Sequence, residues 1–186
     1  VHLFGVPSKL DELVAIAKKH NLKILEDASH AHGATYKGKP IGSFGDVSIF
    51  SMQGNKLCPS GEGGILLCDD QETFESALCL GHYERLLNLE SQNKYFAVTG
   101  FGFKFRMAPM AAALAYSQLQ KLDERNAKRN QNCQYLSRKL EKLGFETFLS
   151  TDDTKRVYFE FLVRYDNKKT GLPIHDVAKA LQAEGA

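Results

Sequence analysis

The sequence lacks an excess of charge of either sign, a long apolar run and a leader-like start. Its 186 residues carry 24 Lys and Arg against 22 Asp and Glu, a formal net charge of +2. A balance this close to neutral does not indicate nucleic-acid binding, which requires a basic surface. No apolar run approaches the roughly 20 residues of a membrane span, and no basic and apolar leader opens the chain. We therefore expect a cytoplasmic protein with no nucleic-acid or membrane partner.

Paired cysteines and internal repeats are also missing. The four cysteines lie in apolar or mixed stretches without CxxC spacing, which predicts free thiols in a reducing compartment: Cys58, Cys68, Cys79 and Cys133. His30 and His32 are close, but no acid cluster follows them, so a metal site is not predicted. The run "GFGFKF" lacks the third glycine of a dinucleotide fingerprint, and "GNKLCPSGEGG" has the wrong order for a P-loop.

The two ends of the sequence predict that it is part of a longer chain. It opens at "VHLFGVP" without methionine, and its first five residues have the pattern of a buried strand, which needs neighbours on both sides. It closes at "KALQAEGA", where an amphipathic helix finishes. We expect an interior piece of a larger protein, and a complete small protein is the alternative.

Alternating strand and helix patterns predict an α/β layered domain with a parallel or mixed sheet. Ser8 precedes an amphipathic segment with Asp11 in the place of a capping-box acid. A Gly-rich polar loop occupies residues 28–46. The apolar runs predict strands at residues 1–5, 22–27, 47–52 and 63–68, and the 3.6-residue periodicity predicts a helix over 71–80.

The second half of the chain has a different order of elements. Residues 84–102 are mixed and loop-like, and a long helical segment is predicted from about Pro109 to Leu143. The alternation in "RVYFEFLVRY", residues 156–165, predicts a strand, and residues 173–185 predict a helix that ends at glycine. We expect one domain over residues 1–143 and the start of a smaller α+β domain over 144–186.

Four reactive side chains follow the predicted strands of the first domain. In open α/β sheets, ligands bind at the carboxyl ends of the strands. Asp27 ends one strand, His30 comes three residues later, Ser51 ends another strand and Lys56 lies in the next loop. Taken singly, a strand-end acid is usually a cap and a loop lysine is usually solvated. Together, an amine, a carboxylate and a hydroxyl are the groups that pyridoxal phosphate needs.

Three stretches resemble one known family. Residues 26–64, "EDASHAHGATYKGKPIGSFGDVSIFSMQGNKLCPSGEGG", resemble the DegT/DnrJ/EryC1/StrS sugar aminotransferases. Residues 1–28 look like the strand-helix-strand unit before the family's cofactor aspartate. Residues 102–129 look like its "GxNxRM" turn and the long helix after it. The resemblance implies fold type I: the C-terminal part of the large domain that binds pyridoxal 5′-phosphate, with a mixed, mostly parallel sheet, followed by the start of the small domain.

The resemblance also implies roles for individual residues. Lys56 corresponds to the catalytic lysine that binds the cofactor covalently, and Asp27 to the partner of the pyridinium nitrogen. Ser51 corresponds to the phosphate-binding serine. His30 stands where many members have a glutamine packed against the cofactor ring near its 3-hydroxyl. Lys104 stands where many members have an asparagine that reaches the phosphate of the neighbouring subunit.

The function implied is amino transfer from glutamate or glutamine to a keto-sugar, in nucleotide-sugar, cell-surface polysaccharide or antibiotic-sugar biosynthesis. Because Lys56 is kept where the dehydratase branch has histidine, transamination is favoured over dehydration. With His30 and Lys104, the chain looks closer to the members that act on keto-inositols. The family also implies a homodimer with shared active sites. The alternative is a non-catalytic fragment, or an inactive homologue that serves as a regulator or scaffold.

Overall fold

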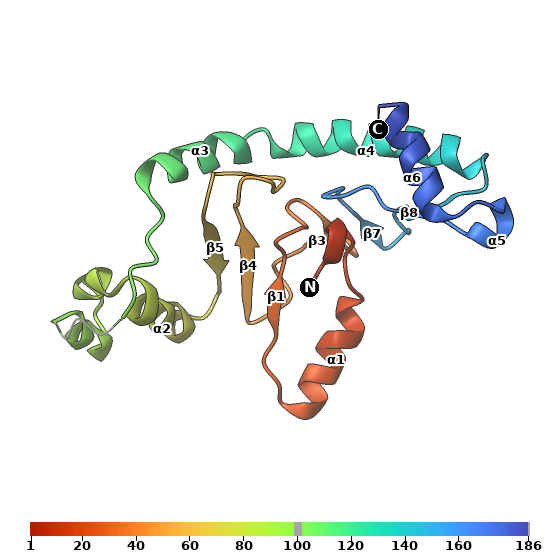
Figure 1. Ribbon diagram of the computed structural model, residues 1–186. Helices are drawn as coiled ribbons and strands as arrows, with labels where there is room; N and C mark the ends of the chain where they lie inside the picture. The colour runs from red at the N-terminus through yellow and green to blue at the C-terminus, as the bar shows by residue number, and fades with distance from the viewer. Residues whose placement is uncertain (99–101, 186) are drawn as a thin grey trace.

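The central sheet is built from three strands of the first half of the chain (Figure 1). The computed structural model describes residues 1–98 and 102–185. β1 (Leu25–Asp27) pairs in parallel with β4 (Val47–Ser51), and β4 pairs antiparallel with β5 (Gly64–Leu67). The order β1-β4-β5 brings the carboxyl ends of β1 and β4 to the same edge of the sheet.

Two smaller sheets flank the central one. β2 (Thr35–Tyr36) pairs antiparallel with β3 (Lys39–Pro40) and with β7 (Thr154–Lys155), although β7 comes more than a hundred residues later in the chain. β6 (Glu146–Thr147) pairs antiparallel with β8 (Val163–Arg164). The pairing of β2 with β7 means that residues 154–155 pack on the first part of the chain. The predicted domain boundary at residue 143 stays a prediction.

Helices cover the carboxyl end of the sheet. α3 (Pro109–Leu119) and α4 (Leu122–Glu141) run one after the other across that end, next to the loop that joins β4 to β5 (Figure 1). The Cys58 thiol contacts the Ala115 carbonyl oxygen of α3, and the Asn126 side chain of α4 donates to the His32 carbonyl. The helices are α1 (Leu10–His20), α2 (Gln71–Gly81), α3 (Pro109–Leu119), α4 (Leu122–Glu141), α5 (Asn167–Thr170) and α6 (Ile174–Ala183), with short 3-10 helices at Leu3–Gly5, Tyr83–Asn88 and Gln92–Val98.

Much of the apolar core lies beyond these carboxyl ends, between the loops that follow β1 and β4 and the helices α3 and α4. Small side chains after β1 let the loop pack closely against α3 and α4, since Ala28 and Ala31 are fully buried and Ala34 is nearly so. Other members come from the loop after β4, from the two long helices and from the C-terminal segment: Met52, Leu57, Cys58, Ala115, Leu122 and Val157. The core therefore joins four parts of the sequence: the loop after β1, the loop after β4, the two long helices and the C-terminal segment.

Most of the predicted elements are confirmed. The structure has strands at 47–51 and 64–67, and helices at 71–81 and 174–183, where the sequence predicts them. The long helical segment is present but is divided into α3 and α4 at residues 120–121, where Lys121 leaves the helical range (φ −103°, ψ 0°). The loop-like stretch after residue 84 contains two 3-10 helices, and residues 99–101 of that prediction lie outside the described residues.

The strand prediction for residues 1–5 is wrong. Leu3–Gly5 forms a 3-10 turn in which Phe4 and Gly5 have positive φ, 55° and 83°. A Cβ atom at Gly5 would lie 2.2 Å from the Val157 carbonyl oxygen, so the close approach of the C-terminal segment requires glycine here. The capping-box prediction is also wrong. α1 begins at Leu10 after Lys9, and the Ser8 hydroxyl instead donates to the Val1 carbonyl.

The strand prediction for residues 156–165 is wrong over most of its length, since only Val163–Arg164 is a strand. Arg156, Val157 and Tyr158 are all buried, at 1%, 0% and 4% exposure. Three consecutive buried residues cannot come from a half-exposed strand, whose side chains alternate between two faces. Tertiary packing against the N-terminal turn therefore overrides the local pattern.

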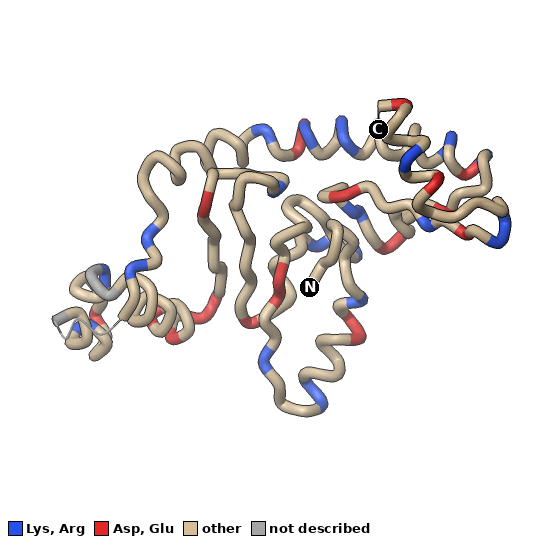
Figure 2. The backbone as a smooth tube through the Cα atoms, viewed as in Figure 1, with Lys and Arg blue, Asp and Glu red and all other residues tan. Residues whose placement is uncertain are grey.

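The distribution of charged residues and the state of the cysteines agree with what the sequence predicts. Lys and Arg are interspersed with Asp and Glu along the described chain (Figure 2). All four cysteines are free thiols, as predicted. Among the described residues, every helix is too short or too polar to cross a membrane.

A buried carboxylate ties the start of the chain to β1. Glu26, 3% exposed, accepts hydrogen bonds from the His2 ring at 2.9 Å and from the amides of Gly42, Phe44 and Gly45 at 2.6, 3.0 and 3.1 Å. Burial alone would raise the pKa of Glu26, but these donors outweigh it and lower the pKa to about 2. Glu26 therefore holds the N-terminal turn, β1 and the loop before β4 in one arrangement.

We predict that Glu26→Gln destabilises the fold by about 3 kcal/mol, because the amide cannot satisfy the same set of donors in a buried place. Since the folded pKa is about 2 and the ordinary value is 4.5, the stabilisation is complete above pH 4.5 and is lost as pH falls from 4.5 to 2. Urea unfolding at several pH values measures both effects. Exposed Glu124→Gln is the matched control and should change little. Equal stability of the two variants at pH 7 would contradict the role of Glu26.

Candidate functional site

Four of the five predicted site residues, Asp27, His30, Ser51 and Lys56, lie at one edge of the central sheet. Asp27 is the last residue of β1 and pairs with Ile49, two residues before the end of β4 at Ser51. Lys56 lies in the turn that follows, where its amide donates to the Gln53 carbonyl at 2.9 Å. Parallel pairing of β1 with β4 is the reason that the carboxylate and the hydroxyl share this edge.

Lys56 and His30 meet on an aromatic ring from the C-terminal segment. The Lys56 Nζ atom lies 4.6 Å from the centroid of the Phe159 ring, a cation–π distance. The His30 ring stacks on the same Phe159, with centroids 4.0 Å apart and planes 17° apart. Phe159 therefore contacts both the amine and the imidazole.

Burial favours the neutral form of His30. Burial and then the positive charge of Lys56 lower the pKa of His30 below its ordinary value, while Asp27 and Glu160 act in the opposite direction. Both the Lys56 amine and the Asp27 carboxylate are thus within electrostatic reach of one imidazole. His30 therefore interacts electrostatically with two other predicted site residues.

The Asp27 carboxylate is kept ionised. Burial raises its pKa, but hydrogen bonds from Ser29 outweigh burial, so the pKa of Asp27 lies below its ordinary value. The Ser29 amide donates to Oδ1 at 3.0 Å. An ionised carboxylate at a strand end is a suitable acceptor for a protonated ring nitrogen.

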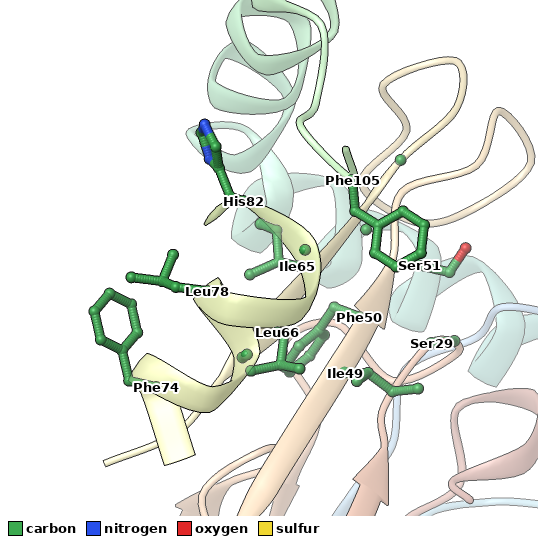
Figure 3. Close-up of a pocket in the computed structure, with 14 residues that line it drawn as sticks. Ser29, Ile49, Phe50, Ser51, Ile65, Leu66, Phe74, Leu78, His82 and Phe105 are labelled. Carbon is green, nitrogen blue, oxygen red and sulfur yellow. The ribbon is translucent and has the colours of Figure 1, made fainter. Parts of the chain in front are cut away.

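A cavity of about 540 Å³ lies beside this edge, between β4, β5 and α2. Its walls are largely apolar, with Phe74 and Leu78 of α2 on one side and Phe50 on the other (Figure 3). Of the five predicted site residues, Ser51 alone is on the wall. Its hydroxyl accepts from the Gln53 amide at 3.4 Å. The cavity thus borders the predicted site at Ser51, while Lys56, Asp27 and His30 lie outside it.

Lys104 lies on the segment that follows α2, and its neighbour Phe105 lines the same cavity as Ser51. It forms an isolated antiparallel bridge with His82, and the amides of Phe103 and Phe105 donate to the carbonyls of residues 80 and 81 at the end of α2. The segment that joins α2 to α3 runs on the β5 side of the sheet (Figure 1). The rings of Phe103 and Phe105 stack at 5.0 Å and are exposed at 58% and 71%. The role of Lys104 stays a prediction.

Sequence reasoning missed three residues around His30. They are Phe4, whose amide donates to His30 Nδ1 at 3.3 Å, Phe159, and the buried Arg156, which donates to the Phe4 carbonyl at 3.2 Å. Residues 156–159 belong to the run that the alternation assigned to a strand. The contacts that join Phe4 to His30 and Arg156 to Phe4 span 26 and 152 residues, so no local signal marks them.

His32, two residues after His30, is a buried histidine near the site. It is 5% exposed, and neither ring nitrogen has a hydrogen-bond partner among the described residues. Its ring packs edge-on against Phe50 with centroids 5.2 Å apart. Burial lowers the pKa of His32 to about 4, so the ring is neutral at physiological pH.

The donor set suits a cofactor with a carbonyl, a basic ring nitrogen and a phosphate. The edge offers an amine that forms covalent bonds to carbonyls, an ionised carboxylate, a hydroxyl and a neutral imidazole. Among residues 1–98 and 102–185, no cluster of His, Cys, Asp and Glu could hold a metal ion. These residues therefore fit pyridoxal 5′-phosphate.

Comparison with known proteins points the same way. The model of the DegT/DnrJ/EryC1/StrS aminotransferase family matches residues 1–186. L-glutamine:scyllo-inosose aminotransferase of Streptomyces griseus is 35% identical over 99% of this chain and 45% of its own length. GDP-perosamine synthase of Caulobacter vibrioides is 37% identical over 77% of this chain and 38% of its own length. The chain thus spans less than half the length of these relatives.

Solved structures agree on the fold. An aminotransferase from Psychrobacter cryohalolentis superposes with a TM-score of 0.76 at 28% identity, over 94% of this chain and 47% of that one. The described chain therefore has part of the fold of a fold type I aminotransferase, as predicted.

We predict that His32 makes the fold less stable in mild acid. Its folded pKa of about 4 lies below the ordinary 6.5, so the unfolded state binds more protons between these values. The free energy of unfolding should fall by up to about 3 kcal/mol as pH drops from 6.5 to 4. His32→Phe should remove that part of the slope in urea titrations at each pH. His20→Gln, at an exposed position on α1, should leave it in place, and an unchanged slope in His32→Phe would refute the assignment.

Proposed function

The chain belongs to the DegT/DnrJ/EryC1/StrS aminotransferase family, and we propose that the whole protein uses pyridoxal 5′-phosphate to aminate a keto-sugar or keto-inositol. The observation that carries the proposal is the convergence of Lys56, Asp27 and His30 at the carboxyl edge of β1 and β4. An amine and an ionised carboxylate at that edge are what this cofactor requires. The family match extends over the residues that supply them.

Four residues of this chain would hold the cofactor. Lys56 would bind its carbonyl carbon, and Asp27 would accept a hydrogen bond from its ring nitrogen. Ser51 would donate to its phosphate, and His30 would contact the ring near the 3-oxygen. When bound, pyridoxal phosphate supplies an electron sink for charge that develops at the α-carbon of the amino donor.

Lys56 is the proton carrier of the proposed reaction. A free amine at this position can remove the α-proton of the donor and return a proton to the acceptor. Phe159 restrains the amine on one side through the cation–π contact. Asp27 stays ionised and so keeps the opposing positive charge on the ring nitrogen favourable. Each of these roles belongs to a residue whose position depends on the packing of the sheet edge.

The names of two relatives support a proposal for the substrate class. The Streptomyces griseus relative is named for glutamine as donor and a keto-inositol as acceptor, and the Caulobacter vibrioides relative for a GDP-linked amino sugar. We propose glutamine or glutamate as the donor and a cyclic polyhydroxy ketone, free or nucleotide-linked, as the acceptor. Biosynthesis of amino sugars or aminocyclitols is the corresponding role.

The proposed functional unit is a homodimer in which the segment around Lys104 reaches the partner's phosphate site. The exposed Phe103 and Phe105 rings support an interface at this segment. Lys104 would offer a positive charge to the phosphate in place of an asparagine.

The first test is covalent trapping at Lys56. The purified protein is mixed with pyridoxal phosphate, reduced with borohydride and digested, and the modified peptide is identified by mass spectrometry. Modification should fall on Lys56, and Lys56→Ala should lose both it and amino transfer, at least about a hundredfold in rate. Lys179→Ala, at an exposed position on α6, should behave as wild type. Stoichiometric trapping that persists in Lys56→Ala would assign the chemistry to another lysine, and no trapping in the wild type would favour a non-catalytic protein.

The second test is Asp27→Asn, which keeps the size of the side chain and removes its charge. Cofactor should still bind, while kcat falls about 10²–10³-fold because the charge opposite the ring nitrogen is lost. Absorbance titration measures binding and single-turnover kinetics measure the chemical step. Unchanged turnover at saturating substrate would remove Asp27 from the mechanism.

A further inference from the structure

The N-terminal turn beside His30 has an unusual backbone. Phe4 has φ 55° and ψ 18°, a left-handed conformation that a residue with a bulky side chain rarely adopts. Such a conformation persists only where the surrounding structure holds it. The Val157 amide donates to the Gly5 carbonyl at 3.1 Å, so the segment that follows Arg156 lies directly against the turn.

A buried arginine holds the turn from the other side. Arg156 is 1% exposed, and among the described residues no carboxylate pairs with it. Its guanidinium donates to the carbonyls of Phe148 and Phe4, the latter at 3.2 Å, and lies 4.1 Å from the Tyr158 ring centroid. A planar fork can bind two carbonyls in fixed directions, which an ammonium cannot do. The carbonyl of the left-handed residue is therefore fixed by a buried charge.

The amide of the same residue, Phe4, determines which nitrogen of His30 carries the proton. The Phe4 amide donates to His30 Nδ1 at 3.3 Å. A backbone N–H can only donate, so Nδ1 must present its lone pair and a neutral ring must carry its hydrogen on Nε2. In the described part of the chain, no hydrogen bond to Nε2 occupies that group.

His2 uses the same device a few residues away. The Ser8 amide donates to His2 Nδ1 at 3.0 Å, and the opposite nitrogen, Nε2, contacts the Glu26 carboxylate at 2.9 Å. There the backbone amide leaves Nε2 as the donor to an anion. By analogy with His2, we expect the Nε2–H group of His30 to donate a hydrogen bond to an oxygen that carries negative charge.

We propose that Arg156 is a positioning residue: it holds the Phe4 carbonyl, fixes the backbone of Phe4, and so keeps the Phe4 amide directed at His30, which is held as the Nε2–H tautomer. The ring then offers the site a hydrogen-bond donor and no acceptor. This rests on the proposed function only for the identity of the oxygen that it meets, the 3-oxygen of pyridoxal phosphate. Donation to that oxygen favours its anionic form. Stacking on Phe159 fixes the plane of the ring, and the amide fixes its proton.

The direct test is the tautomer in the wild-type protein without added cofactor. Protein labelled with ¹⁵N at its 6 histidines is measured by long-range ¹H–¹⁵N correlation at about pH 8, above the ordinary pKa of histidine. Loss of one spin system in His30→Gln assigns the ring. We expect an unprotonated Nδ1 and a protonated Nε2, close to their limiting shifts. A protonated Nδ1, or averaged shifts for both nitrogens, would overturn the proposal.

The relay is tested by Arg156→Lys, which keeps the charge and loses the fork. The Nδ1 and Nε2 shifts of His30 should move toward each other as the second tautomer gains population. Arg164→Lys, at an exposed arginine paired with Glu146, is the matched control and should leave them unchanged. A folded Arg156→Lys protein with wild-type shifts would show that Arg156 plays no part.

If Arg156→Lys does not fold, replacement of Phe4 by phenyllactic acid tests whether the Phe4 amide holds the tautomer of His30. The ester keeps the side chain and removes the amide hydrogen, so the same convergence of shifts is expected, and wild-type shifts would refute the proposal. None of these measurements requires bound cofactor. Failure of Lys56 trapping would therefore refute the proposed function without touching the tautomer, and the reverse also holds.

Discussion

The buried Glu26 carboxylate is the interaction on which the rest of the described site depends. It accepts hydrogen bonds from His2 and from three amides of the loop before β4, and it is the residue next to Asp27. A carboxylate taken out of water must be satisfied by donors, because an unpaired buried charge is strongly unfavourable. The loop and the N-terminal turn must therefore both adopt the positions that satisfy it. Those positions fix β1, and with it the position of Asp27 at the end of that strand.

The site is assembled from segments that are far apart in the sequence. The sheet edge supplies Asp27 and Ser51, the following turn supplies Lys56, and the C-terminal segment supplies Phe159. Close packing requires small residues where these segments meet, which explains the buried alanines after β1 and the glycine at position 5. A change in the C-terminal segment would reach His30 without altering any residue that touches the proposed cofactor.

The electrostatics of this region favour one pattern of charge. Lys56 is positive, Asp27 is held negative, and both His30 and His32 are held neutral because burial disfavours their charged forms. Neutral imidazoles can take part in hydrogen bonds without competing with Lys56 for charge. The fold of the chain and its family match make this pattern interpretable, since the same edge of the sheet is the ligand-binding edge in open α/β folds.

The sequence by itself determined the two strands at 47–51 and 64–67, the helices at 71–81 and 174–183, and the order of Asp27, His30, Ser51 and Lys56 along the chain. These features depend on short-range periodicity and on motifs, each of which lies within a short stretch of the sequence. Tertiary structure decided that residues 1–5 turn and do not form a strand, that residues 156–159 are buried, and that Phe159 joins Lys56 to His30. The reason is physical: these conformations are stabilised by partners up to 152 residues away, and local preference is weaker than the burial of Arg156 and Val157 against the N-terminal turn.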